Sequence, residues 1–376
     1  MGYINSFGVY QTFYETNQLS NMTPSDISWI GSLQNFFIFF SGLFGGTLFD
    51  RYGANIIRPA AVAFVLSIMM TSLCKEYWHF MLAQGLLGGV SNGLIMSPSM
   101  AATSQYFSKK RGAAMGLAIA GSSVGAVVFP IALVKMLHGN GDQLGFGWAV
   151  RVCGFIVLGL LIWPCVAIKA RLPPRKSNFL LLSALKDPTY VIIITSTFLL
   201  FLGFFTPLFY LPSYAMQHGM GADLASYLLS ILNGASFAGR IIPGILADKV
   251  GRFNMLAAAG ISSGILTLCW TLCTTNATMI IFAVLYGFCS GAIVSGFTVS
   301  LAFCADEPKN IGTYMGMGMA IASVAMLVGP PINGTLLSHY QRFEEMAVFS
   351  GVMCLSGGFI VFAAKWTSGK GLLAAL

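Results

Sequence analysis

Two aspartates in similar surroundings are the first candidates for chemistry in this chain. Asp50 lies within residues 46–53 (GTLFDRYG) and Asp248 within residues 244–251 (GILADKVG), so both copies read Gly-x-Leu-x-Asp-basic-x-Gly. The two aspartates are 198 residues apart, about half of the chain. Each one ends a long apolar segment, where a carboxylate can pair with a basic side chain or accept hydrogen bonds from helix N-terminal amides. The repeated phrase predicts an internal duplication.

Glycines frame each copy of the phrase. Gly46 and Gly244 are expected to let neighbouring helices approach closely. Gly53 and Gly251 are expected to permit a tight turn after each helix. The repeat continues at an offset of 200 residues, and the matching pairs are Gly112/Gly312, Met115/Met315, Gly116/Gly316, Ala120/Ala320, Ser123/Ser323, Val124/Val324 and Pro130/Pro330.

A single arginine inside an apolar segment is the second candidate. Arg240 precedes Asp248 by eight positions, which places it ~12 Å deeper along a helix that rises about 1.5 Å per residue. A charge at that depth in a membrane costs at least about 2.5–3.5 kcal/mol, so it normally faces a cavity or a partner. A guanidinium suits bidentate binding of a carboxylate. The alternative is structural pairing of Arg240 with a protein carboxylate or with helix carbonyls.

Uncharged polar and aromatic residues within the same apolar segments could complete a cavity. Gln11, Asn233 and Tyr210 are candidates for contact with a substrate, and interhelical hydrogen bonds would explain the amides equally well. Tyr10, Phe205, Tyr210 and Tyr214 could form an aromatic wall, although packing at the lipid face is the favoured interpretation for most of them. The seventh apolar segment is expected to be broken by Gly203, Pro207 and Pro212.

Composition requires lipid as the solvent of this chain. It is 56% hydrophobic and 9% charged with a mean hydropathy of +0.78, whereas soluble domains carry about 25% charged residues. Its apolar runs of about 20 residues match helices that cross ~30 Å of hydrocarbon, and they lack the alternation of a β-barrel. The expected fold class is an all-α membrane protein with twelve helices, the first of which we expect to be truncated: 1–14, 27–49, 56–74, 78–104, 112–136, 147–169, 190–217, 223–247, 254–273, 277–304, 311–338 and 345–365.

Basic residues divide unevenly between the two sides that alternating helices define. Sixteen lie on one side and four, namely Lys75, Lys135, Arg151 and Arg342, lie on the other. The positive-inside rule puts the larger group and the C-terminus in the cytosol, and the plasma membrane is the expected location. The net charge of +8 is therefore a topology signal. Nucleic-acid binding by the basic cluster at 109–111 is not expected, because that cluster abuts a membrane helix.

Glycosylation sequons agree with this orientation. Asn21 and Asn276 begin Asn-x-Thr sequons in loops that the topology places outside. A third sequon at Asn333 falls within an apolar run and is expected to be inert. Prolines and charges over residues 170–189 predict a cytosolic linker. It would separate an N-terminal six-helix bundle, residues 1–169, from a C-terminal six-helix bundle, residues 190–376.

The repeated phrase resembles the signature of the major facilitator superfamily, and the resemblance covers nearly the whole chain. Residues 106–116 (YFSKKRGAAMG) and 120–125 (AGSSVG) resemble the fifth-helix motif of monocarboxylate transporters, especially fungal ones. Gly239-Arg240 and the run that ends at Arg252 fit the same family. The resemblance implies a twelve-helix fold with two six-helix bundles around a central cavity, and transport by alternating access.

The resemblance also implies roles for individual residues. The residues of the repeated phrase would govern gating at the cytosolic face: Asp50, Arg51, Asp248, Lys249 and Arg252. Arg240 would hold a substrate carboxylate. Proton-coupled lactate carriers pair this arginine with an aspartate one turn earlier, where this chain has Ser236, and they carry a first-helix lysine, whose neighbourhood here contains Gln11. An uncharged carrier or an exporter of a bulkier organic molecule fits these departures better, and proton coupling stays open.

The leading hypothesis is a secondary transporter of a small organic molecule, for which a carboxylate is one expectation. The alternatives are an efflux carrier for a secondary metabolite and a non-transporting membrane sensor on the same scaffold. Enzyme chemistry, cofactors and metals are not expected, because no metal-ligand spacing, nucleophile elbow or phosphate loop occurs.

Overall fold

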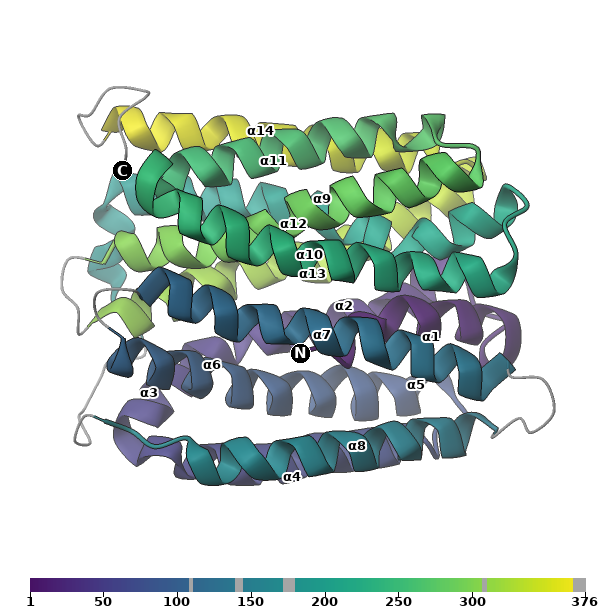
Figure 1. Cartoon of the computed structure of the whole chain (residues 1–376), viewed down its shortest axis with the longest axis horizontal. Helices are drawn as coiled ribbons and strands as arrows, with labels where there is room; N and C mark the ends of the chain where they lie inside the picture. Colours follow the sequence, from purple (N-terminus) through teal and green to yellow (C-terminus); the bar gives the residue numbers. More distant parts are fainter. Residues whose placement is uncertain (108–110, 139–144, 172–179, 306–309, 368–376) are drawn as a thin grey trace.

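The structure is a computed structural model that describes residues 1–107, 111–138, 145–171, 180–305 and 310–367. Within these ranges every regular element is a helix, and the helices lie side by side along the long axis of the molecule (Figure 1). The basic residues at 109–110 and residues 172–179 of the expected linker fall outside the described residues. So do the side chains of Asp248 and Lys249, whose backbone is described.

The first half of the chain folds into helices that match the predicted runs within a few residues. Its elements are η1 (Ile4–Ser6), α1 (Phe7–Phe13), η2 (Tyr14–Gln18), α2 (Pro24–Phe40), α3 (Gly42–Tyr52), η3 (Gly53–Ile56), α4 (Ile57–Thr71), α5 (Tyr77–Phe80), η4 (Met81–Leu87), α6 (Gly88–Tyr106), α7 (Arg111–His138) and α8 (Phe146–Ala167).

The second half repeats the pattern with longer uninterrupted helices. Its elements are η5 (Leu182–Lys186), α9 (Pro188–Gln217), α10 (Ala222–Val250), α11 (Arg252–Cys269), η6 (Trp270–Leu272), α12 (Asn276–Phe303), α13 (Ile311–Tyr340) and α14 (Glu344–Thr367).

Ten stretches of the described residues are long and apolar enough to cross a membrane. One of them, Pro24–Thr71, has 48 residues and contains two passes, because the chain turns at Gly53. The short helical segment from Ile4 to Gln18 adds a further helix. The prediction of an all-α, twelve-helix membrane protein is confirmed.

Local sequence signals fix where these helices begin and end. Thr23 and Asp26 form a capping box before α2, in which each side chain accepts a hydrogen bond from the backbone amide of the other residue. Asp187 caps α9 by accepting from the Thr189 amide at 2.9 Å. Gly53 and Gly251 follow α3 and α10 with φ of +66° and +102°. Since side chains disfavour this backbone region, the prediction of turn glycines in both copies of the phrase is confirmed.

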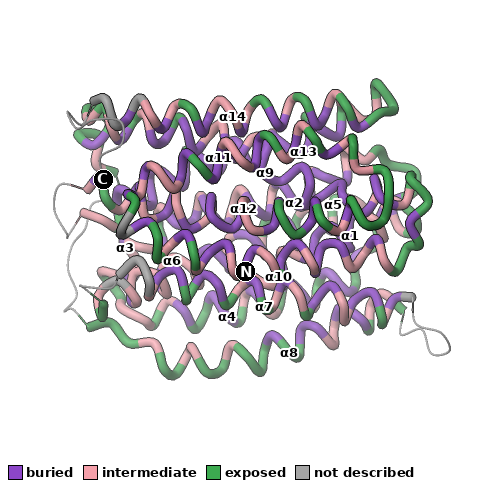
Figure 2. The backbone as a smooth tube through the Cα atoms, turned by 45° about the horizontal axis from the view of Figure 1, so that its top comes forward, coloured by how far each residue is buried: buried purple, intermediate pink, exposed green. Residues whose placement is uncertain are grey.

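The two ends of the molecule can be named by the loops that they carry. α3 and the C-terminus lie at the left end in Figure 1, which we call the Asp50 end; the opposite end is the Asn21 end. Exposed residues lie mainly on outward faces (Figure 2), and many are large and apolar. On α8, Trp163 is 79% exposed and Val166 is 68% exposed. Lipid would cover such side chains.

The two six-helix bundles meet along two helix pairs, α2 with α13 and α7 with α10. Near the Asn21 end, the Ser25 hydroxyl lies 3.2 Å from the Pro331 carbonyl oxygen and 3.2 Å from the Thr335 hydroxyl. Towards the Asp50 end, a Cβ added to Gly316 would lie 3.2 Å from the Gly42 carbonyl oxygen. The bundles therefore touch near both ends of α2.

The predicted break in the seventh membrane helix is wrong. α9 contains Gly203, Pro207 and Pro212, yet it runs without interruption from Pro188 to Gln217. Neighbouring helices supply hydrogen bonds around prolines within a membrane; here the Tyr286 hydroxyl donates to the Phe204 carbonyl at 2.7 Å.

Close helix approach occurs at other glycines than the two predicted. A Cβ on Gly244 would have no neighbour within 4 Å, and one on Gly46 would come no closer than 3.7 Å to another atom. By contrast, a Cβ on Gly203 would overlap the Ser350 carbonyl oxygen of α14, and one on Gly45 would lie 2.9 Å from the Ser97 Cβ. The signature glycines at the start of each phrase therefore do not set the helix spacing.

Gly203→Ala is expected to destabilise the fold, because the added methyl group must push α9 away from the α14 backbone. Overpacking of this kind costs roughly 1–3 kcal/mol. The measurement is the temperature at which half of the detergent-purified protein loses its monodisperse elution peak. Gly244→Ala is the matched control and should leave that temperature unchanged; equal losses in both variants would contradict the assignment.

Candidate functional site

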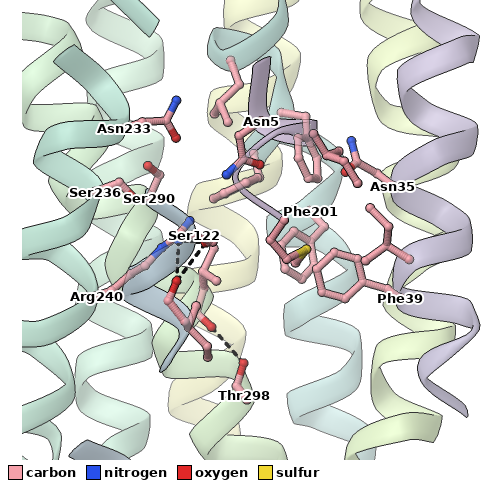
Figure 3. Close-up of a pocket in the computed structure, with 18 of the residues that line it drawn as sticks. Asn5, Asn35, Phe39, Ser122, Phe201, Asn233, Ser236, Arg240, Ser290 and Thr298 are labelled. Atoms are coloured by element: carbon pink, nitrogen blue, oxygen red, sulfur yellow. Dashed lines mark hydrogen bonds between the residues drawn. The ribbon is translucent and has the colours of Figure 1, made fainter. Parts of the chain in front are cut away.

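One pocket lies between the two bundles and contains most of the predicted site. Its cavity volume is about 50 Å³, so its walls lie close together in this arrangement. Figure 3 shows its polar and aromatic side chains, which come from both halves of the chain. The residues that line it are Met1, Ile4, Asn5, Asn35, Ile38, Phe39, Met96, Ile119, Ser122, Phe201, Phe204, Phe205, Leu208, Leu232, Asn233, Ser236, Arg240, Ser290, Val294, Phe297 and Thr298.

Arg240 is the one charged side chain among the described residues that line this pocket. It projects from α10 and is only 6% exposed. Its Nη1 atom donates to the Ile119 carbonyl oxygen at 3.1 Å and to the Ser122 hydroxyl at 2.5 Å, both on α7. Its Nε atom is buried and has no hydrogen-bond partner. The guanidinium therefore keeps unused donor capacity beside the pocket.

The electrostatics of the pocket favour a negatively charged ligand. A buried cation is normally paired with an anion, because burying it without a counter-charge destabilises the protein by roughly several kcal/mol. Here the neutral acceptors Ile119 and Ser122 hold Arg240, and no described acidic side chain lines the pocket. An anionic group on a ligand would supply the missing charge and could bond two N–H groups at once.

Uncharged hydrogen-bonding groups lie on both walls. Asn233 and Ser236 are on α10 with Arg240, and both are buried. The Asn233 amide nitrogen donates to the Leu229 carbonyl at 2.8 Å, which leaves its side-chain oxygen as an acceptor. Asn5 and Asn35 come from the first bundle (Figure 3). A ligand in the pocket could thus bond to both bundles.

Aromatic rings form the apolar part of the pocket. Phe201 of α9 packs edge-on against Phe297 of α12 with ring centroids 5.0 Å apart, and Phe39 of α2 lies 6.1 Å from Phe201. Phe204 and Phe205 extend this surface along α9. Such rings offer edges and faces on which a planar or aromatic ligand can stack.

Some predicted site residues lie elsewhere. Gln11 is fully buried, and its amide nitrogen donates to the Glu15 carboxylate at 3.0 Å on the same helical segment. The Tyr210 hydroxyl donates to the Pro330 carbonyl at 3.1 Å. Neither residue is among those that line the pocket. The structure thus brings Arg240, Asn233 and Ser236 together and leaves Gln11 and Tyr210 outside that group.

The aromatic wall also differs from the predicted one. Phe205 belongs to it, whereas Tyr10 bonds the Tyr3 hydroxyl at 2.6 Å and Tyr214 donates to backbone carbonyls at Thr271 and Cys273. Ser122, Asn5, Phe39 and Thr298 were not predicted. Ser122 lies within residues 120–125, the run that resembles a transporter motif. Its place in that motif was the one sequence feature that could have marked it as a site residue.

The predicted gating residues lie at the Asp50 end. Asp50 is half-buried in α3, and Arg51 beside it is exposed. Arg252 begins α11 and lies over the Phe303 ring at 4.9 Å from its centroid. Asp248 and Lys249 occupy the last turn of α10, where their side chains are not described.

The three sequon asparagines occupy different environments. Asn21 and Asn276 are exposed at the Asn21 end of the molecule. Asn333 is fully buried in α13, where its side-chain oxygen accepts from the Ser350 hydroxyl at 3.0 Å. Burial is consistent with the prediction that the third sequon is inert.

Comparisons with known proteins identify the family. A model of the Major Facilitator Superfamily matches residues 1–278 and 241–372. The chain is 53% identical over 375 residues to the aspyridones efflux protein of Emericella nidulans, covering 99% of this chain and 76% of that protein. It is 38% identical over 379 residues to the agnestins efflux protein of Paecilomyces divaricatus, covering 99% and 86%.

A solved structure extends the comparison to the fold. The crystal structure of the human organic anion transporter MFSD10 superposes with a TM-score of 0.68 at 16% identity, covering 95% of this chain and 89% of that one. Likeness at this identity concerns the fold alone, and it agrees with the helical fold described above. On the family match and the relatives together, the chain belongs to the major facilitator superfamily.

Proposed function

We propose that this protein is an efflux carrier that exports an acidic, partly aromatic secondary metabolite by alternating access. The observation that carries this proposal is Arg240, a buried cation on the wall of the central pocket without a described carboxylate beside it. Its free donors would bind the acidic group, and the rings of Phe39, Phe201 and Phe297 would hold the apolar body.

Two relatives support export as the direction of transport. The names of the aspyridones and agnestins efflux proteins describe export of fungal metabolites. The resemblance to fungal monocarboxylate permeases stays a prediction about the subfamily. Several phenyl rings wall the pocket, and such rings suit a partly aromatic molecule better than a short-chain monocarboxylate. Ser236 supplies a hydroxyl where lactate carriers have an aspartate, so the carboxylate that those carriers place beside the arginine is replaced here by a neutral group.

We place the Asp50 end in the cytosol of a plasma-membrane protein, because the sequence concentrates basic residues there. In this proposal residues 1–169 and 190–376 rock as two rigid units around the pocket. Asp50, Arg51, Asp248, Lys249 and Arg252 would hold the cytosolic ends together while the pocket opens outwards.

Arg240→Ala should reduce binding of an aromatic acid by at least about tenfold, because a charge-assisted bond in a dry site is lost. The measurement compares radiolabelled 2-naphthoate with neutral 2-naphthamide on purified protein, and aspyridones serve as candidate cargo in export assays. Arg151→Ala is the matched control, since Arg151 bonds Ser72 at 3.0 Å and stacks on Trp148 outside the pocket. Unchanged naphthoate binding in Arg240→Ala would remove Arg240 from the site.

Asp50→Asn should slow turnover several-fold while KM changes less than about twofold, because a gating residue acts on the conformational step and not on the bound ligand. Asp223→Asn alters an exposed acidic residue at the opposite end of α10 and should leave both constants unchanged. The assay is initial-rate export from inside-loaded vesicles. A loss confined to KM would contradict the gating role.

Asn21→Gln and Asn276→Gln should each lower the apparent mass of protein made in a yeast host, if the Asn21 end faces the secretory lumen and then the cell exterior. Enzymatic deglycosylation of the unaltered protein should reproduce the double variant. Thr335→Ala, which deletes the sequon of buried Asn333, should have no effect on mass. A mass change from Thr335→Ala would be inconsistent with burial of that site.

A further inference from the structure

The bond between Arg240 and Ser122 joins the two bundles. Arg240 belongs to α10 in the second half, and both of its described acceptors belong to α7 in the first half. Ser122 in turn donates its own hydroxyl proton to the Ile119 carbonyl oxygen at 2.8 Å, which orients the serine oxygen as an acceptor. The α7 helix therefore presents a prepared pair of acceptors to a cation on the other bundle (Figure 3).

This bond lies in the part of the pocket nearer the Asp50 end. Arg240 and Ser122 are each ~15 Å from the Asp50 end of their helices, at about 1.5 Å per residue. Leu208 and Leu232 line the pocket further towards the Asn21 end. The bundles must part at the Asp50 end if a ligand is to enter the pocket there, and parting them would separate Arg240 from α7.

The donors of Arg240 cannot serve α7 and a ligand equally at once. A guanidinium has five N–H groups in a fixed planar arrangement. The Nη1 atom is engaged by Ile119 and Ser122, and the Nε atom is buried against the protein. In this closed arrangement α7 occupies Nη1, so a bond that joins an anion to both Nη1 and Nη2 is obtained only when α7 withdraws.

We propose that Ser122 is a positioning residue that competes with the acidic group of the substrate for Arg240. When the Asp50 end is open, the guanidinium binds the anion; when α7 and α10 meet, Ser122 and Ile119 take over Nη1 and weaken the hold on the anion. A ligand that binds one arrangement more tightly shifts the equilibrium towards it, so the anion would favour separation of α7 from α10. The competition rests on the proposed function, and in an exporter it would load substrate on the Asp50 side and promote release at the other.

Binding of 2-naphthoate to purified full-length protein tests the competition. Ser122→Ala should bind the acid about tenfold more tightly than the unaltered protein, as expected when a hydrogen bond to a charged group no longer opposes binding. Ser122→Thr keeps the hydroxyl and should behave like the unaltered protein. Ser123→Ala is the control, because Ser123 is the next residue on α7 and is fully buried, yet it neither lines the pocket nor bonds Arg240.

A second measurement needs no ligand. Hydrogen exchange of α7 amides between residues 116 and 127 should rise in Ser122→Ala and stay unchanged in Ser123→Ala, since the contact between bundles is weakened only in the former. Unchanged hydrogen exchange in Ser122→Ala would show that this bond does not hold the bundles together, and it would overturn the competition whatever the result of the naphthoate binding measurement.

The outcomes separate this competition from the proposed function. If Arg240→Ala loses naphthoate binding but Ser122→Ala binds as before, the proposed function stands and the competition is wrong. Weaker binding in Ser122→Ala makes the serine a direct ligand of the substrate and also overturns the competition. If the unaltered protein and Arg240→Ala bind the acid equally, the proposed function itself fails.

Discussion

The structure depends on how one buried positive charge is accommodated between two bundles that must be able to separate. Charged side chains inside membrane proteins face cavities or partners, and Arg240 faces both, with Ile119 and Ser122 of α7 on one side and the pocket on the other. A carboxylate partner within α10 would have neutralised it permanently. Ser236, one turn earlier, offers only a hydroxyl, so the cation stays available to whatever enters the pocket.

The α10 helix packs more tightly against α12 of its own bundle than against α7 of the other bundle. Cβ atoms on Gly239 or Gly287 would overlap backbone carbonyl oxygens across the contact between α10 and α12, so these two helices are as close as backbones allow. Across the contact between α10 and α7, Cβ atoms on Gly234 and Gly116 would have their nearest neighbours at 3.8 and 3.6 Å. Arg240 is therefore fixed to its own bundle by tight backbone packing and to the other bundle by hydrogen bonds that can be exchanged.

Sequence reasoning succeeded where the cause was local. Apolar run lengths and the turn glycines Gly53 and Gly251 are properties of a few adjacent residues, and they predicted the helices and the turns. It failed where the cause was tertiary. The prolines of α9 suggested a break, but neighbouring helices stabilise the continuous form. Tyr210 was a plausible ligand by type, yet packing against α13 commits its hydroxyl to the Pro330 carbonyl.

The pairing of Arg240 with Ser122 illustrates why half of the site lay beyond prediction. The burial cost of an arginine can be read from one helix, whereas its acceptors are 118 to 121 residues away and are brought close only by the meeting of the bundles. The contact between the bundles nevertheless explains why an arginine suits this position. A lysine carries its donors on a single nitrogen, while the planar guanidinium can hold α7 through one nitrogen and offer another to a ligand. A residue that serves two partners benefits from donors on separate nitrogens in a fixed plane, and the guanidinium of arginine provides them.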